Sequence, residues 1–182
     1  LYYKSVKGTH WSEKDIDLDN VESLVNQFDI EYLNAKVLTS RGINIRNFNN
    51  FLNSKIKNNL PNPSILLDLD MSTDLIVDFI FNKRKIGILG DYDVDGATST
   101  ALLCSYLKKI NAPYEYYIPD RVKEGYGPNK GAFQKLMEKG CKLVLTVDCG
   151  TTANISIEEA TNNGTKIVVV DHHQQGGKLP EN

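Results

Sequence analysis

The chain has 182 residues, of which 41% are hydrophobic and 24% are charged, and its net charge is −2 at pH 7. These values are ordinary for a globular protein, and the charge argues against a domain that binds polyanions through bulk positive charge. No run of residues approaches the roughly 18 apolar residues that a membrane helix needs, and no signal-peptide pattern opens the chain. Three cysteines without a CxxC pair indicate reduced thiols, so we expect a cytoplasmic protein with no membrane partner.

Residues 1–84 are polar and rich in asparagine, and their apolar residues recur at helical spacing. The spacing predicts three helices: one that carries Val21 and Phe28 on one face, a second near 44–57, and a third over 72–83. Pro61 and Pro63 interrupt the chain between the second helix and the third. We therefore predict a helical N-terminal segment over 1–84.

From residue 85 onward, apolar strands alternate with amphipathic helices. The predicted strands are 85–90, 114–118, 142–147 and 166–170, and the predicted helices are 96–110, 128–139 and 152–163. This alternation is typical of βαβ units, whose strands form a parallel sheet that helices cover on both faces. The predicted fold class is therefore α/β, with a parallel β-sheet domain over 85–182.

Each predicted strand is followed closely by an acidic residue. Asp91 follows the first strand, Asp120 the second, Asp148 the third, and Asp171-His172-His173 the fourth. The carboxyl ends of parallel strands lie at one edge of a sheet, where open α/β folds bind their ligands. We therefore expect these residues to meet in one acidic crevice that also contains histidine.

Three aspartates, Asp91, Asp93 and Asp95, alternate directly behind the first strand. Carboxylates this close repel one another, and a bound cation turns the repulsion into ligation. A calcium-binding EF-hand begins in the same way, but Leu102 stands where its glutamate belongs, and a strand precedes the loop. The glycines do not have the GxGxxG spacing of a phosphate-binding loop. A phosphatase with an aspartyl nucleophile remains an alternative, although it does not require two adjacent histidines.

The other groups at this edge add ligands to the aspartates. His172 and His173 stand behind an aspartate at a strand end, which is hard to explain as a structural feature. Imidazole and carboxylates without a thiolate favour Mn²⁺, or Mg²⁺, over structural zinc. Asp148 alone fits a helix cap as well as a ligand, and its place at the shared edge favours a ligand that bridges two ions.

The loop behind the second strand contains Arg121 and Tyr126. A guanidinium group binds phosphate bidentately, and a tyrosine ring can stack on a base. A glycine-bearing turn with solvated charges explains the same residues equally well. Residue types alone leave both interpretations open.

Together these motifs resemble the DHH phosphoesterase superfamily and, in their longer strings, its RecJ-like exonucleases. The strings are Gly90–Ala101, Tyr117–Gly127 and Thr146–Gly150, followed by Asp171–His173. The resemblance extends upstream through Ser40–Ile43, so that it covers roughly residues 38–180. Pro128 departs from the pattern, because the family more often has an apolar residue there.

The resemblance implies a 5′→3′ exonuclease that acts on single-stranded DNA in recombination and repair with Mn²⁺ or Mg²⁺. It also implies that Arg121 holds the 5′-phosphate end, and we expect Tyr126 to stack on a base. The expected ligands of two metal ions are Asp91, Asp93, Asp95, Asp148 and His172. We expect Asp171 to orient an imidazole and His173 to contact the scissile phosphate or transfer a proton. A single-strand-binding protein or a helicase is the expected protein partner.

Two other functions stay open at this point. Other DHH proteins hydrolyse pyrophosphate, short oligonucleotides or cyclic dinucleotides, and a replicative-helicase subunit of this fold is a non-catalytic module. The retention of every aspartate argues against a decayed site. RecJ-like proteins continue beyond the DHH motif with a further metal-binding aspartate, a second domain and an OB-fold. We therefore expect this chain to be an N-terminal part of an enzyme, with an incomplete site that is inactive alone.

Overall fold

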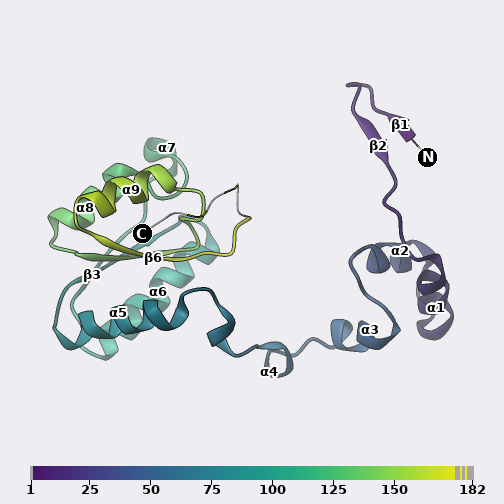
Figure 1. The fold of residues 1–182 in the computed structure, drawn as a ribbon, viewed down its shortest axis with the longest axis horizontal. Helices are drawn as coiled ribbons and strands as arrows, with labels where there is room; N and C mark the ends of the chain where they lie inside the picture. Colours follow the sequence, from purple (N-terminus) through teal and green to yellow (C-terminus); the bar gives the residue numbers. More distant parts are fainter. Residues whose placement is uncertain (1, 175–176, 178, 180–182) are drawn as a thin grey trace. The chain divides into compact units, whose positions relative to one another are not determined.

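The structure is a computed structural model that describes residues 2–174, 177 and 179 (Figure 1). The chain forms two compact units, Leu1–Asn62 and Pro63–Asn182, and each is considered by itself. None of the helices in the described part combines the length and the apolar character that crossing a membrane requires.

The first unit consists of a small hairpin and four helices. Its elements are β1 (Tyr2–Lys4), β2 (His10–Ser12), α1 (Leu18–Phe28), α2 (Tyr32–Ser40), α3 (Ile45–Leu52) and α4 (Ile56–Asn59). The two strands pair antiparallel. The helices bury a core of four residues, Val21, Leu24, Ala35 and Phe48, and the rings of Phe28 and Phe48 stack with their centroids 4.0 Å apart.

The prediction of one helix over 44–57 is wrong, because the helix ends at Leu52. The side-chain amide of Asn53 donates to the carbonyl of Asn49 at 3.2 Å, and such local hydrogen bonds compete with helix continuation. Of the apolar residues at helical spacing, Phe48 is buried, whereas the others are exposed: Ile45, Phe51, Leu52 and Ile56. The apolar pattern therefore covers two short helices and the break between them.

The second unit is a parallel sheet with helices on both faces, which confirms the predicted α/β class. Its strands are β3 (Ile86–Gly90), β4 (Tyr114–Tyr117), β5 (Leu143–Val147) and β6 (Lys166–Val170). Its helices are η1 (Pro63–Ile65), α5 (Leu69–Phe81), α6 (Val94–Lys109), α7 (Arg121–Glu124), α8 (Lys130–Glu138) and α9 (Asn154–Asn162). The strands lie in the order β4-β3-β5-β6, and every neighbouring pair is parallel.

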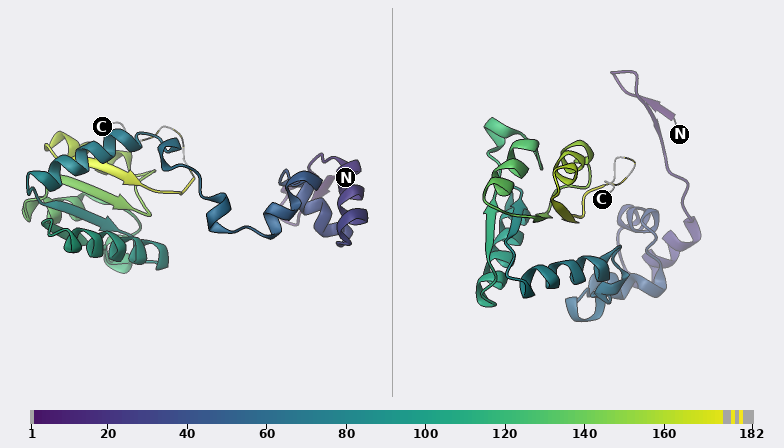
Figure 2. Two further views of the ribbon diagram at one scale, coloured as in Figure 1. Left: turned by 90° about the horizontal axis from the view of Figure 1, so that it is seen from below. Right: turned by 60° about the vertical axis from the view of Figure 1, so that its left-hand side comes forward.

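Helices cover both faces of this sheet, as Figures 1 and 2 show, and a hydrophobic core lies on each face. On one face, α8 and α9 contribute Phe133, Leu136 and Ile157 to a core with strand residues such as Val144. On the other face, α5 and α6 pack against alternate residues of the same strands. All residues of β3 and β5 are buried, as expected for central strands that helices cover on both sides.

Helix α5 belongs to the compact second unit, because Phe79 packs with Ile86 of β3 in one core. The sequence pattern placed this helix in the segment over 1–84. The compact unit thus begins at Pro63, and the division into a segment 1–84 and a domain 85–182 stays a prediction about domain boundaries.

The strand order creates a crevice at the carboxyl ends of β3 and β5. The chain leaves β3 through α6 on one face of the sheet and leaves β5 through α9 on the other face. Loops that diverge in this way open a crevice between the two strand ends, which is where open α/β sheets bind ligands. Gly90 pairs with Val147 at the last position of the ladder, so Asp91 and Asp148 both emerge at this crevice.

Candidate metal centre

Five side chains from three strand ends form two overlapping groups of possible metal ligands. Asp91, Asp93 and Asp148 form one group, and Asp148, His172 and His173 form the other, with the ligand atoms of each group within 4.8 Å of one another. Asp148 is common to both groups. Asp91 and Asp148 are only 2% and 6% exposed, whereas the two histidines are exposed, so the site has an acidic buried side and an open side.

Asp95 is not part of either group. It lies exposed in the first turn of α6, and its carbonyl oxygen accepts a hydrogen bond from the hydroxyl of Ser99 at 2.5 Å. Of the three alternating aspartates, the structure therefore brings two into the ligand groups and leaves the third on the surface of the helix.

Asp93 is both a possible ligand and the N-cap of α6. Its Oδ1 accepts a hydrogen bond from the backbone N–H of Gly96 at 2.9 Å, and this bond lowers the pKa of Asp93. Gly96 permits the tight turn, because a Cβ there would lie 2.5 Å from the carbonyl oxygen of Asp91. The helix start thus fixes one carboxylate oxygen of Asp93 and holds the segment against the strand end.

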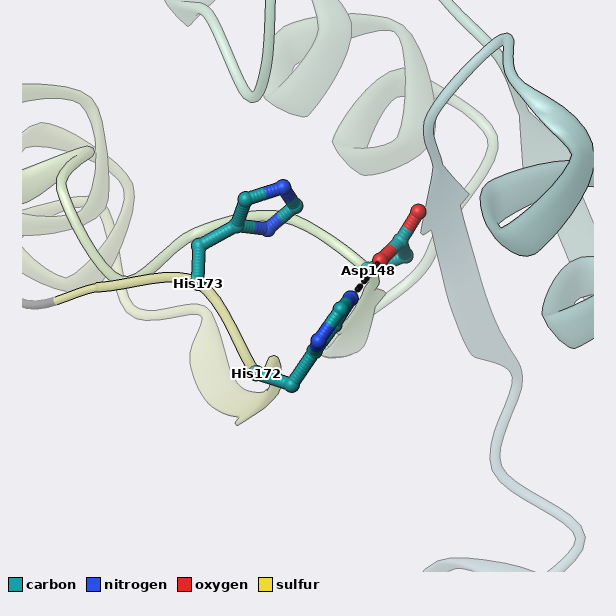
Figure 3. A group of neighbouring side chains, drawn as sticks. All are labelled: Asp148, His172 and His173. Carbon is teal, nitrogen blue, oxygen red and sulfur yellow. Dashed lines mark hydrogen bonds and ion pairs between the residues drawn. The ribbon is translucent and has the colours of Figure 1, made fainter. Parts of the chain in front are cut away.

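Asp148 carries the strongest indication that a cation binds at this edge. Its Oδ1 lies 3.0 Å from Nε2 of His172, while its Oδ2 is buried without a hydrogen-bond partner (Figure 3). Burial and the neighbouring Asp93 raise the pKa of this carboxyl, because both disfavour its negative charge. The residue also holds a left-handed backbone, with φ of 59°.

A buried polar atom in a native protein normally has a partner, and Oδ2 of Asp148 has none. A bound cation would provide that partner, and it would also offset the repulsion between Asp148 and Asp93. The donor set of carboxylates and imidazoles without a thiolate suits Mn²⁺ or Mg²⁺ better than a structural zinc ion. The described residues therefore fit a divalent metal at the shared oxygen atoms of Asp148.

Asp171 supports the second histidine. Its Oδ2 accepts from the backbone N–H of Thr151 at 2.9 Å, and its Oδ1 lies 2.8 Å from Nδ1 of His173. Burial raises the pKa of Asp171, but the hydrogen bonds from Thr151 and His173 outweigh it and leave the pKa below its ordinary value. The hydrogen bond with Asp171 in turn raises the pKa of His173.

The loop behind β4 approaches the same edge through two side chains. The guanidinium carbon of Arg121 lies 4.6 Å from the ring centroid of Tyr92, the residue between the first two aspartates. The hydroxyl of Tyr126 lies 3.4 Å from Nε2 of His173. Burial and the nearby carboxylates raise the pKa of Tyr126 to about 12.

Asp120, which also follows a strand, is not part of either ligand group. Its side chain instead accepts a hydrogen bond from the backbone N–H of Val122 and caps α7.

An open cavity of about 820 Å³ adjoins the histidine group. Its lining includes Tyr126 and Pro128 from the loop before α8, residues at the start of α9, and Asp171 and His173 behind β6. Pro128, the residue that departs from the family pattern, is therefore a wall of this cavity.

Sequence reasoning missed several residues that shape the site: Tyr92 under Arg121, Thr151 beneath Asp171, and Glu124 at the end of α7. Of these three residues, only Glu124 could have been found from the sequence, because it stands four residues after Asp120 in a short charged turn. The other two act through contacts between distant segments.

The chain resembles known proteins both in sequence and in fold. The family described as the DHH family, N-terminal domain, matches residues 85–182, which is more than half of the chain. The single-stranded-DNA-specific exonuclease RecJ of Bacillus subtilis is 38% identical over 172 residues, a match that covers 94% of this chain and 22% of the relative. The chain thus spans about a fifth of the length of this relative.

Two solved structures resemble the fold. A crystal structure of exonuclease RecJ bound to manganese matches with a TM-score of 0.59 and 34% identity, over 64% of this chain and 30% of that one. A structure of RecJ from Thermus thermophilus in complex with Mn²⁺ matches with a TM-score of 0.57 and 25% identity, over 90% of this chain and 22% of that one. From its sequence match and its fold, the chain belongs to the DHH family.

Proposed function

We propose that this chain forms part of the active site of a nuclease that hydrolyses the phosphodiester bonds of single-stranded DNA with the help of divalent metal ions. The observation that carries the proposal is Asp148, a buried carboxylate that is shared by two ligand groups and has an unpartnered oxygen. The names of the relatives, which are single-stranded-DNA-specific exonucleases, supply the substrate. Following the resemblance to RecJ-like exonucleases, we assign the cleavage the direction 5′→3′ and the enzyme a role in recombination and repair.

Two Mn²⁺ or Mg²⁺ ions would be held by the two groups, and the manganese in the solved relatives supports this choice of metal. Asp91, Asp93 and Asp148 would bind one ion, and Asp148 and His172 the other. Such a pair of ions, when bound, activates water and stabilises the charge of the attacked phosphate. Asp95 lies outside both groups, and its role as a ligand stays a prediction.

The remaining residues of the centre orient the substrate and hold protons. The contact between Asp171 and Nδ1 of His173 leaves Nε2 on the open side of the ring, next to the Tyr126 hydroxyl. Nε2 is therefore the atom that we assign to the scissile phosphate or to proton transfer. His172 and Asp148 are 3.0 Å apart, which holds the imidazole toward the shared carboxylate.

We assign Arg121 to the phosphate at the 5′ end and Tyr126 to stacking on a base. Arg121 is exposed and cationic, and its contact with Tyr92 keeps it next to the aspartate segment. Tyr126 is 55% exposed and lines the cavity beside His173, so its ring is available to a ligand.

The wider setting is also part of the proposal. A single-strand-binding protein or a helicase would present the DNA end. The unpaired state of Cys104, Cys141 and Cys149 supports a reducing compartment, and we assign the protein to the cytoplasm. A non-catalytic module of the same fold is disfavoured, because burying a carboxylate with one unpartnered oxygen, such as Oδ2 of Asp148, is costly unless a ligand binds it.

The test is a cleavage assay with the full-length protein in the presence of Mn²⁺ or of a chelator. Long 5′-phosphorylated single strands are compared with duplexes, dinucleotides, cyclic dinucleotides and pyrophosphate. We expect metal-dependent loss of nucleotides from the long single strand. Cleavage confined to the small substrates would transfer the assignment to the other DHH phosphoesterases, and absence of metal-dependent cleavage of any of them would refute it.

A further inference from the structure

The short helix α7 that carries Arg121 cannot define its own orientation. It has four residues, and a helix of this length forms too few internal hydrogen bonds to be stable by itself. Val122 and Lys123 project into solvent, with Val122 fully exposed. The direction of the Arg121 side chain must therefore depend on contacts that tie the turn to the rest of the unit.

Glu124, the last residue of α7, makes these contacts in three directions. Its Oε1 accepts a hydrogen bond from the hydroxyl of Tyr117 at 2.6 Å and another from the backbone N–H of Asp120 at 3.1 Å. Its Oε2 accepts from the ammonium group of Lys135 at 3.1 Å. Glu124 thus joins the two ends of its own turn to strand β4 and helix α8.

The three side chains of this network also contact one another. The ammonium group of Lys135 donates to the hydroxyl oxygen of Tyr117 and lies 4.3 Å from the centroid of its ring. The ring of Tyr117 packs against the core between the sheet and α8. The Tyr117–Glu124–Lys135 network therefore rests on the rigid part of the unit.

An ordinary surface ion pair would not have these properties. The side chain of Glu124 is 20% exposed, and two of its three donors are uncharged groups with fixed positions. The same hydrogen bonds, from Tyr117 first and then from Asp120 and Lys135, lower the pKa of Glu124 to about 2. Glu159, by contrast, pairs with Lys130 and is 42% exposed.

We propose that Glu124 is a positioning residue that, through Tyr117 and Lys135, holds Arg121 beside the aspartates and so sets the preference for DNA ends that carry a 5′-phosphate. Arg121 precedes Glu124 by three residues in the same turn, so a turn that loses its anchor moves the guanidinium away from Tyr92. The inference rests on the proposed function, and specifically on the contact between Arg121 and the terminal phosphate.

The experiment measures kcat and KM of the full-length protein on single strands with a 5′-phosphate and with a 5′-hydroxyl end. The variants are Glu124→Ala, Glu124→Gln, Tyr117→Phe, Arg121→Ala and the double variant with Arg121→Ala and Glu124→Ala. Glu159→Ala is the control, because it breaks a lysine–glutamate pair that joins α8 to α9 and does not involve α7. Tyr117→Phe removes the hydroxyl and keeps the packed ring, so it decides the question even where Glu124→Ala does not fold.

We expect Glu124→Ala and Tyr117→Phe to reduce the preference for the phosphorylated end by roughly tenfold, through KM, because a displaced contact group costs binding more than chemistry. Cleavage of the 5′-hydroxyl strand should not change. Glu124→Gln keeps an oxygen acceptor for Tyr117 and Asp120 and should retain most of the preference. The double variant should lose no more than Arg121→Ala alone, because the two residues act as one unit.

A preference that survives Tyr117→Phe, or that survives Glu124→Ala where this variant folds, would overturn the inference, as would an equal loss of kcat on both ends. If Arg121→Ala leaves the preference unchanged, the phosphate assignment fails together with the positioning role. If the wild type does not cleave single strands at all, the proposed function itself fails. The three failures are therefore distinguishable in one set of assays.

Discussion

The two compact units of this chain differ in how they bury their residues and in what they can hold in place. In the second unit, β3 and β5 are buried along their whole length, and cores lie on both sides of the sheet. In the first unit, the helices share a core of four buried residues. Both ligand groups that were found among the described residues lie at strand ends of the second unit.

The difference explains why the candidate metal centre lies at the edge of the sheet. A strand that is fixed by ladders on both sides and by cores on both faces leaves the residue after its last ladder pair little freedom. The strand ends therefore hold Asp91 and Asp148 in fixed positions. Burying two negative charges close together costs free energy, and the cores on both faces of the sheet offset this cost. A small core supplies less stability, so the first unit is the part that mutations should unfold first.

The largest expected effect comes from Asp148→Asn, which keeps the shape and tolerates the left-handed backbone but removes the charge. We expect cleavage to fall to the metal-free background, because both ligand groups lose their shared member. The thermal midpoint without metal should stay the same or rise, since a costly buried carboxylate is gone. Added Mn²⁺ should raise the midpoint of the wild type but not that of the variant. Asp74→Asn on the exposed face of α5 is the control, and equal activity of the two variants would remove Asp148 from the mechanism.

Phe48→Ala tests the weakness of the first unit. Phe48 is 2% exposed and stacks on Phe28, so we expect a loss of about 3–5 kcal/mol from that unit. Hydrogen–deuterium exchange should become faster over α1 to α3 while the amides of β3 and β5 keep their protection. Phe51→Ala is the matched control on the same helix, because Phe51 is 49% exposed. Faster exchange in the sheet as well would show that the two units do not unfold separately.

Gly96→Ala tests how tightly the aspartate segment is held in the second unit. A Cβ at this position meets backbone atoms of Asp91, which cannot move aside as a side chain does. We expect a destabilisation of about 1–3 kcal/mol in denaturant unfolding, together with weaker metal binding. Gly131→Ala in α8 is the control, since its nearest neighbour is a side-chain oxygen at 3.3 Å. Equal stabilities of the two variants would contradict the tight turn.

The smallest expected effect is the loss, at acidic pH, of the contribution of Glu124 to the free energy of unfolding. Its pKa is about 2 in the folded protein against an ordinary value of 4.5, so its contribution to stability is present above about pH 4.5 and is lost as the pH falls toward 2. The stability advantage of the wild type over Glu124→Gln should therefore shrink between about pH 5 and pH 3 in denaturant unfolding. An advantage that grows with acidity would contradict the network.

The sequence predicted the second unit better than the first for a physical reason. Central strands of a parallel sheet are continuous apolar runs, and the acidic residues behind them mark the strand ends, so the sheet and the edge where the candidate ligands gather were predictable. The hairpin β1–β2 was missed because His10–Ser12 is exposed and has no apolar alternation. Helix α2 was missed because it buries only Ala35 and has no side-chain cap.

Within the candidate site, the limits of the sequence were those of tertiary contact. A strand end predicts which residues reach an edge, but it does not say that Asp93 turns toward Asp148 while Asp95 stays on the helix surface. The phase of α6, which starts at the Asp93 cap, decides this. The contact of Arg121 with Tyr92 likewise depends on the orientation of a four-residue turn, which no local pattern determines.

The most direct test of the central claim is a calorimetric titration of Mn²⁺ into the full-length wild type, Asp148→Asn and Asp95→Asn. We expect two ions to bind to the wild type, both to be lost or strongly weakened in Asp148→Asn, and binding to change less in Asp95→Asn, because Asp95 lies outside the two groups. Binding by Asp148→Asn with the stoichiometry and affinity of the wild type, or no binding by the wild type, would contradict the central claim.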